Sequence, residues 1–192
     1  KDLAGVLSQI PKQNWSVGRV EISTNGQFAD WEQIAEAFKT GVLGQLVVSC
    51  DGDGTAESYE RLRPPSKWDK LIEFLERTKE LRDRHQPDLP LITRTICPDP
   101  QQQARWKSVL EPRGWQPEFR DWLYLPESEQ NMTGRDPEVP ATICSFQAAA
   151  DRLYVDWDGT VVPCCVHPRA GTMGNLASQT YNEIMAGPMR AA

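Results

Sequence analysis

Strand-like and helix-like segments alternate along the first two-thirds of the chain, and this order constrains the fold more than any other feature. Short apolar segments at residues 20–24, 45–49 and 91–96 are typical of strands. A fourth strand or extended segment is expected at residues 119–125. Helices placed between strands make right-handed crossovers between parallel neighbours. The order therefore predicts an α/β fold with parallel strands.

The segments between these strands carry helix signals. Asp30 is expected to cap a helix that runs through Phe38, and Ser66 is expected to cap a longer helix. A third helix is expected at residues 100–110. In the longer helix, apolar residues recur at helical spacing, namely Trp68, Leu71, Ile72, Leu75 and Leu81.

Four strands are half of an eight-stranded (β/α) barrel and do not close one alone. An exposed edge of a parallel sheet is a liability. We therefore expect that more chain precedes residue 1 or that a partner chain covers this open edge. The first residue is Lys and not Met, which suggests a fragment or a processed chain.

The composition changes in the last third of the chain. Residues 126–140 form a polar connector flanked by prolines. Residues 152–156 alternate in strand fashion, Asp158-Gly159 is a hairpin turn, and residues 160–162 form the returning strand. A short helix is expected around residues 181–185.

Three of the five cysteines flank this hairpin. Cys144 precedes the outgoing strand, whereas Cys164 and Cys165 follow the returning strand, and His167 lies two residues further on. A hairpin brings its two ends together, so these thiolates could converge on one metal centre. Soft thiolate ligands favour iron–sulfur clusters or zinc.

Composition sets the broad class of protein. Hydrophobic residues make up 39% and charged residues 25%, which is typical of a globular domain. The sequence has no secretion signal and no apolar run long enough to span a membrane, so we expect a cytoplasmic protein. The net charge of −6 disfavours binding to nucleic acid.

The remaining cysteines and several tryptophans are expected in the core. Cys50 and Cys97 each end a strand and are interpreted as small buried hydrophobes. Trp68 and Trp106 occupy helical positions and are predicted to be core residues. Three further tryptophans could line a cleft, but core packing is the favoured prediction for them: Trp115, Trp122 and Trp157.

The segment from Cys144 to Ile184 resembles the start of a SPASM or twitch domain, an extension found in radical S-adenosylmethionine (SAM) enzymes. In that family a cysteine precedes a hairpin with an Asp-Gly turn, which leads into Val-x-Pro-Cys-Cys and then Gly-Asn-Leu. The matching residues here are Asp158-Gly159-Thr160-Val161-Val162-Pro163-Cys164-Cys165, Gly174-Asn175-Leu176 and Asn182-Glu183-Ile184-Met185.

The resemblance implies that Cys144, Cys164 and Cys165 ligate an auxiliary [4Fe–4S] cluster. Such clusters usually take four ligands, so His167, a substrate group or a further C-terminal segment would complete the site. The alternative is zinc held by the same three cysteines and His167.

The first part of the chain also resembles the radical SAM barrel, from its third strand onward. Thr24-Asn25-Gly26 and Val48-Ser49-Cys50-Asp51-Gly52 match motifs at the ends of consecutive strands in that family. Ser49 and Asp51 lie on one face of a strand end, where ligands bind in barrels, and suit the ribose hydroxyls of SAM. Arg63 or Arg94 could pair with the SAM carboxylate.

One departure from the family is serious. The sequence has no C-x-x-x-C-x-x-C loop for the catalytic cluster and no Gly-Gly-Glu step, so this chain alone should not cleave SAM. The resemblance implies a partial radical SAM barrel at residues 1–125, a linker at 126–140 and a SPASM-like domain at 141–192. The intact enzyme would cleave SAM reductively and abstract hydrogen from a substrate, for which a peptide is one candidate. The alternative is a non-catalytic remnant or a small zinc-binding or interaction module.

Overall fold

The computed structural model of this protein describes residues 2–12, 17, 19–121, 153–163 and 171–187. The chain divides into two compact units, residues 1–122 and 123–192. Each unit is described by itself.

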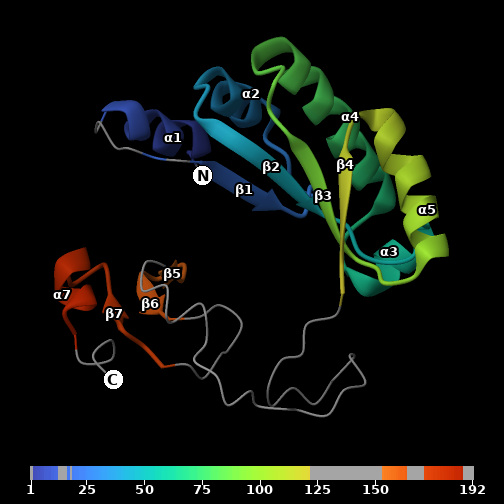
Figure 1. Cartoon of the computed structure of the whole chain (residues 1–192). Helices are drawn as coiled ribbons and strands as arrows, with labels where there is room; N and C mark the ends of the chain where they lie inside the picture. The colour runs from blue at the N-terminus through green and yellow to red at the C-terminus, as the bar shows by residue number, and fades with distance from the viewer. Residues whose placement is uncertain (1, 13–16, 18, 122–152, 164–170, 188–192) are drawn as a thin grey trace. The chain divides into compact units, whose positions relative to one another are not determined.

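The first unit is built on a four-stranded parallel sheet in the order β1-β2-β3-β4 (Figure 1). This confirms the predicted α/β class with parallel strands. Each strand pairs with its neighbour in sequence, as expected when a helical segment lies between consecutive strands. The strands are β1 (Val20–Thr24), β2 (Leu43–Ser49), β3 (Leu91–Ile96) and β4 (Gln116–Arg120).

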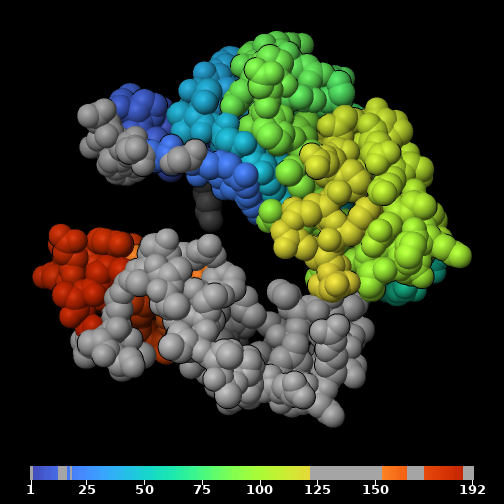
Figure 2. Space-filling view, viewed as in Figure 1, coloured from blue at the N-terminus to red at the C-terminus, as the bar shows by residue number. Residues whose placement is uncertain are grey.

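Helices α2, α4 and α5 lie over one face of this sheet (Figure 1), and the unit forms one continuous body in the space-filling view (Figure 2). A short 3₁₀ turn follows α5. The helices are α1 (Leu3–Lys12), α2 (Trp31–Lys39), α3 (Ala56–Leu62), α4 (Trp68–His85), α5 (Pro100–Leu110) and the 3₁₀ turn η1 (Glu111–Arg113).

The two faces of the sheet differ in character because alternate residues of a strand point to opposite sides. The helix-covered face contributes Leu46, Val48 and Leu91 to the hydrophobic core. The opposite face carries the charged residues Glu21 and Arg94 beside the buried Val47. Residues paired across neighbouring strands share a face of the sheet. Gln45, Ser49 and Glu118 therefore lie on this face too, because Glu21 pairs with Gln45 and Arg94 pairs with Ser49 and Glu118.

The predicted N-cap of the longer helix is wrong in position by one residue, and the group that caps the helix end is also different. The N-cap of α4 is Lys67, which makes no side-chain capping bond, and not Ser66. The backbone N–H of Trp68 donates instead to the Glu60 carboxylate at 3.1 Å. A carboxylate from the preceding helix therefore satisfies the helix end that a serine was expected to satisfy.

Two further expectations need correction. The fourth strand begins at Gln116 and ends at Arg120, earlier than the predicted range of 119–125. Helices α1 and α3 were not predicted. Side-chain caps mark both starts, because Asp2 accepts from the Gly5 N–H at 2.7 Å and Thr55 accepts from the Ser58 N–H at 3.3 Å.

The second unit contains a three-stranded antiparallel sheet in the order β5-β6-β7 and a short helix. The predicted hairpin and helix are confirmed, and β7 is an additional strand. These elements are β5 (Tyr154–Val155), β6 (Thr160–Val162), β7 (Gly174–Asn175) and α7 (Tyr181–Met185). In the part of the chain that the structure describes, no helix has the length and apolar character needed to cross a membrane.

The tryptophan predictions are confirmed for three residues. Trp106 and Trp115 are fully buried, and Trp68 packs against the core. Trp157 is 98% exposed at the hairpin turn, so its predicted place in a core is wrong. Trp122 lies outside the described residues.

Candidate functional site

Asp51 and Arg63, two of the predicted SAM-binding residues, lie together at the carboxyl end of β2. The Arg63 Nε donates to the Asp51 carboxylate at 2.5 Å, and the Ile96 backbone N–H approaches the same carboxylate at 3.5 Å. Both side chains are about a quarter exposed. The pair therefore presents a carboxylate and a guanidinium at the edge of the sheet where ligands bind in (β/α) barrels.

Ser49 and Arg94 are paired in the register of β2 and β3, on the face of the sheet opposite the helices. Arg94 donates through Nε to Glu118 at 2.9 Å and through a terminal nitrogen to Glu21 at 3.0 Å. Arg19 and Arg120 extend this pattern at the two ends by pairing with Glu21 and Glu118 respectively. We call these five alternating charges the charge ladder.

The charge ladder fixes the ionisation of its two glutamates. Burial alone raises the pKa of Glu21, but hydrogen bonds and positive charge from Arg19 and Arg94 lower it below its ordinary value. Burial likewise raises the pKa of Glu118, and Arg94 and Arg120 lower it further than burial raises it. Both carboxylates are therefore ionised at neutral pH, and both accept hydrogen bonds from Arg94.

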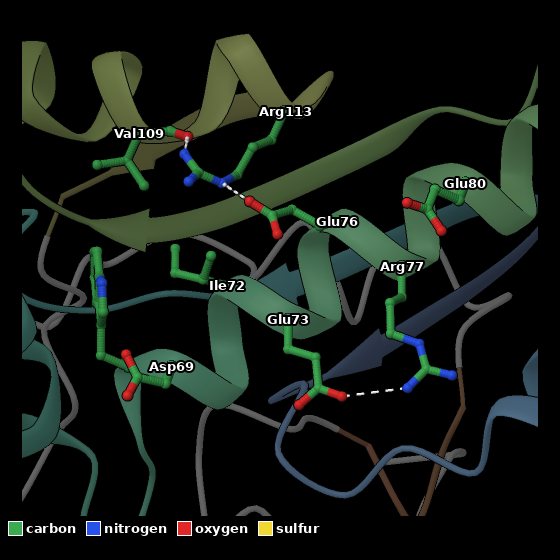
Figure 3. Close-up of a pocket in the computed structure, with 9 residues that line it drawn as sticks. Asp69, Ile72, Glu73, Glu76, Arg77, Glu80, Val109 and Arg113 are labelled. Atoms are coloured by element: carbon green, nitrogen blue, oxygen red, sulfur yellow. Dashed lines mark hydrogen bonds and ion pairs between the residues drawn. The ribbon is translucent and has the colours of Figure 1, made fainter.

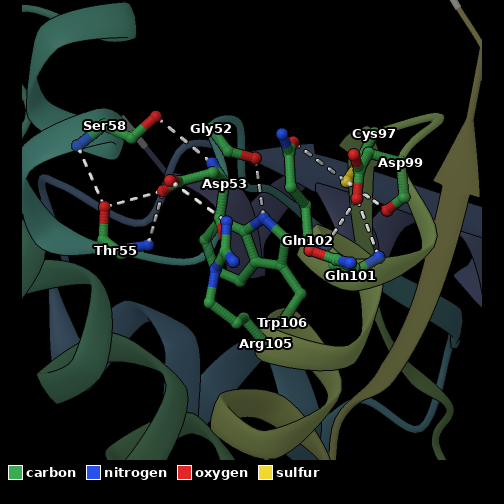
Figure 4. A network of polar contacts seen from close by, with 10 residues as sticks. All are labelled: Gly52, Asp53, Thr55, Ser58, Cys97, Asp99, Gln101, Gln102, Arg105 and Trp106. Carbon is green, nitrogen blue, oxygen red and sulfur yellow. Dashed lines mark hydrogen bonds and ion pairs between the residues drawn. The ribbon is translucent and has the colours of Figure 1, made fainter.

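The loop that follows β2 is braced against α5 (Figure 4). The Trp106 indole N–H donates to the Gly52 carbonyl at 2.9 Å, and Arg105 contacts both the carbonyl and the carboxylate of Asp53. Gly54 has a φ of +89°, and a Cβ there would lie 3.0 Å from the Arg105 Cβ. These contacts anchor the loop that follows Asp51 to α5.

Cys50 and Cys97 are confirmed as buried core residues. Burial raises the pKa of both thiols, most strongly that of Cys50. Neutral, buried thiols are poor metal ligands and poor nucleophiles. Within the described ranges, no group of three His, Cys, Asp or Glu side chains is arranged to hold a metal ion.

A separate groove of about 600 Å³ lies on the outer surface, between α4 and the end of α5 (Figure 3). We call it the acidic groove, because Asp69, Glu73, Glu76 and Glu80 line it. Two of these acids are already paired, Glu73 with Arg77 and Glu76 with Arg113.

The hairpin of the second unit is held by turn chemistry. The Thr160 N–H donates to the Asp158 carboxylate at 2.9 Å, and Gly159 adopts a φ of +86°. Tyr154 pairs with Val162, so the chain segments that enter and leave the hairpin emerge side by side. Cys164 follows this exit by two residues in the sequence.

Asn175 links the hairpin turn to the start of α7, and sequence reasoning missed this role. Its side-chain amide donates to the Asp158 carbonyl at 3.2 Å, and its side-chain oxygen accepts from the Ala177 N–H at 2.7 Å. Its backbone N–H donates to the Gln179 side chain at 3.0 Å. The residue belongs to the Gly-Asn-Leu motif, but no local sequence signal indicates its partners.

The preceding glycine of that motif is required by packing. A Cβ at Gly174 would lie 2.9 Å from the Ile184 side chain and 2.5 Å from the Gln179 side-chain oxygen. Gly174 and Asn175 together therefore dock α7 against the hairpin.

Comparison with family models decides the assignment of this unit. Residues 144–192 match the family model of SPASM, described as an iron-sulfur cluster-binding domain. The C-terminal part of this chain is a SPASM domain. The match covers about a quarter of the chain and contains the hairpin, the Gly-Asn-Leu motif and α7. No curated protein and no solved structure matches the chain.

The three predicted ligands of the SPASM domain, Cys144, Cys164 and Cys165, lie outside the described residues, as does His167. The donor set is nevertheless of the right chemical kind, because thiolates are the usual ligands of iron–sulfur clusters. The hairpin geometry is also suitable, because the described strands return the chain to its starting point just before Cys164. The residues present therefore fit a cluster, and their individual assignment as ligands stays a prediction.

Proposed function

We propose that this chain is part of a radical SAM enzyme in which the SPASM domain holds an auxiliary [4Fe–4S] cluster and the four-stranded unit contributes to a SAM site. The observation that carries the proposal is the SPASM match at residues 144–192. It falls on the segment whose cysteines flank a hairpin.

In this proposal Cys144, Cys164 and Cys165 supply thiolates to the cluster, which would serve in electron transfer or substrate binding. The braced hairpin turn and the Asn175 contacts would hold Cys164 and Cys165 at a fixed exit from β6. A ligand set positioned by a rigid scaffold binds metal more tightly than the same residues on an open chain.

Ser49 and Asp51 remain our candidates for the SAM ribose, because a hydroxyl and a partly exposed carboxylate can both hydrogen-bond to ribose hydroxyls. Arg63 is our first candidate for the SAM carboxylate. We rank Arg94 after it, because Arg94 already donates to two glutamates whereas Arg63 pairs with Asp51.

Reductive cleavage of SAM in this family needs a C-x-x-x-C-x-x-C cluster loop, and these 192 residues contain none. We propose that another segment of the same protein, or a partner chain, supplies that loop and covers the open edge of the sheet. The substrate class we favour is a peptide.

SAM binding to this chain tests the part of the proposal that involves the four-stranded unit. We expect calorimetry to detect SAM binding that weakens about tenfold in Asp51→Asn, equivalent to about 1.4 kcal/mol. Ser49→Ala, which leaves the Asp51–Arg63 pair intact, should weaken binding by a smaller factor. Asp156→Asn removes the same charge in the hairpin unit and should leave the affinity unchanged.

Thermal unfolding of each variant would show whether the fold is preserved. SAM that fails to bind the wild-type chain, or that binds Asp51→Asn and Asp156→Asn equally well, would contradict the proposed SAM site.

A further inference from the structure

A pocket of about 500 Å³ lies among the loops at the carboxyl ends of β1 and β2, where the chain after β1 faces the connection between α3 and α4. We call it the basic pocket. Arg63 is the one lining residue that has a role in our proposed function. The lining residues are Asn25, Gln27, Phe28, Arg63, Pro64, Pro65, Ser66, Lys67 and Lys70.

The two walls of the basic pocket are tied together by Gln27. Its side-chain nitrogen donates to the Tyr59 hydroxyl at 3.1 Å and to the Lys67 carbonyl at 3.2 Å. Its side-chain oxygen accepts from the Lys67 N–H at 2.6 Å. Because Tyr59 is fully buried, this bracing anchors the pocket to the core, and the pocket exists before any ligand binds.

The charge of the lining is opposite to that of the chain. Three cations line the pocket and no acidic residue does so, although the net charge of the chain is −6. The acids that pair with these cations, Asp51, Glu60 and Glu73, are not part of the lining. The acidic groove, by contrast, is lined by four acids and two arginines.

An exposed aromatic ring stands at the basic pocket. Phe28 is 90% exposed, and two prolines, Pro64 and Pro65, line the pocket with it. Leaving a large aromatic side chain in water forgoes most of the free energy that its burial would provide. A ligand that covers Phe28 gains that energy.

We propose that the basic pocket binds an acidic peptide segment in which an aromatic or large apolar residue lies beside carboxylates. The carboxylates would pair with Lys67 and Lys70, and the apolar side chain would pack on Phe28 and the prolines. The charge of the lining thereby indicates the class of partner by complementarity. This proposal does not depend on SAM cleavage by the enzyme.

A peptide suits this pocket better than a phosphate compound does. Phosphate sites commonly use free backbone N–H groups at a helix start. The N–H of Trp68, at the start of α4, is already occupied by the Glu60 carboxylate. Lysine point charges pair with phosphates as well as with carboxylates. The preference for a peptide therefore comes from Phe28 and the two prolines, which an inorganic anion would leave uncovered.

Calorimetry with unlabelled capped tripeptides tests this proposal on the whole chain without SAM. We expect acetyl-Glu-Phe-Glu-amide to bind about tenfold more tightly than acetyl-Lys-Phe-Lys-amide, because the charge of the lining selects the anion. Acetyl-Glu-Ala-Glu-amide should also bind more weakly than the aromatic peptide. Binding of the acidic peptide should weaken as salt rises from about 50 mM to about 500 mM.

Variants of the pocket give a sharper test. Phe28→Ala should weaken binding of the acidic aromatic peptide about fivefold and leave binding of the alanine peptide nearly unchanged. Lys67→Glu combined with Lys70→Glu should reverse the preference between acidic and basic peptides. Lys107→Glu, a single charge reversal at an exposed position of α5 outside the pocket, should leave the preference intact.

Equal affinity for the acidic and basic peptides, or a Lys107→Glu effect as large as that of the pocket variants, would overturn the proposal. Displacement of the acidic peptide by inorganic phosphate at equal concentration would also overturn it, in favour of a phosphate site. None of these outcomes depends on the presence of a cluster, so failure here is distinguishable from failure of the proposed SAM site.

Discussion

The two units of this chain bury very different amounts of apolar surface in their described residues. The four-stranded unit fully buries Trp106, Tyr59 and Trp115, whereas the described part of the SPASM unit buries only Val161 and Ile184. Small units commonly draw on another source of stability, such as a metal centre. Among the described residues, the first unit is therefore stabilised mainly by packing, whereas the hydrogen bonds of the Asp158-Gly159 turn and of Asn175 hold the second. We propose that the cluster adds to the stability of the second unit.

The largest effect is expected from Trp106→Ala in the four-stranded unit. This change empties a fully buried site and removes the hydrogen bond to the Gly52 carbonyl. The free energy of unfolding should fall by about 3–5 kcal/mol, measured by chemical denaturation. Trp157→Ala removes a side chain that is 98% exposed in the SPASM unit. It should change the free energy of unfolding by less than about 0.5 kcal/mol.

A smaller effect is expected from Asn175→Ala in the SPASM unit. The change removes the side-chain contacts with Asp158 and Ala177, and should cost about 1–2 kcal/mol of local stability. Hydrogen exchange of the β6 amides should become faster, while exchange in β2 and β3 should not change. Asn182→Ala, on the exposed surface of α7, is the matched control; exchange as fast as in Asn175→Ala would contradict this account.

The smallest effect is expected from Arg94→Gln in the charge ladder. At neutral pH the variant should lose about 1 kcal/mol, because the pairs with Glu21 and Glu118 are partly exposed. The folded state lowers the pKa of both glutamates below their ordinary value of 4.5, so the stabilisation is complete above that pH. As pH falls below about 4.5, the unfolded chain protonates first and the stabilisation declines.

Denaturation of the wild type and of Arg94→Gln between pH 4 and pH 7 would measure this decline. The difference in stability should stay constant above about pH 5 and narrow below about pH 4.5. Lys39→Gln, which breaks the exposed pair with Glu36, should lose less than Arg94→Gln at every pH. A difference for Arg94→Gln that grows in acid would show that the glutamates are not stabilised by the arginine.

Much of the first unit could be predicted from the sequence because local signals agree with the tertiary structure. The strand at Val20–Thr24 and the helix at Pro100–Leu110 have the predicted bounds. Ser66 was misassigned as a cap because the competing group, the Glu60 carboxylate, comes from the previous helix. Such a contact depends on how two helices meet, which local sequence does not encode.

The sites were harder to predict for the same reason. Ser49 and Asp51 could be placed at a strand end from alternation alone, but the partners of Arg94 come from β1 and β4, which lie far apart in the sequence. Phe28 and Lys70 carry no motif, and they line one pocket only because Gln27 ties two loops together. The Asp158-Gly159 turn was predictable, whereas the contacts of Asn175 follow from the docking of α7.

Anaerobic reconstitution of the whole chain with iron and sulfide tests the central claim most directly. We expect the chain to bind iron and sulfide in equal amounts with the broad visible absorbance of a cluster. Both should fall in Cys144→Ala and Cys164→Ala but not in Cys50→Ala or Cys97→Ala, which change buried core thiols. A colourless chain that holds stoichiometric zinc, or one whose iron content is indifferent to Cys144 and Cys164, would contradict the claim that this SPASM domain carries an iron–sulfur cluster.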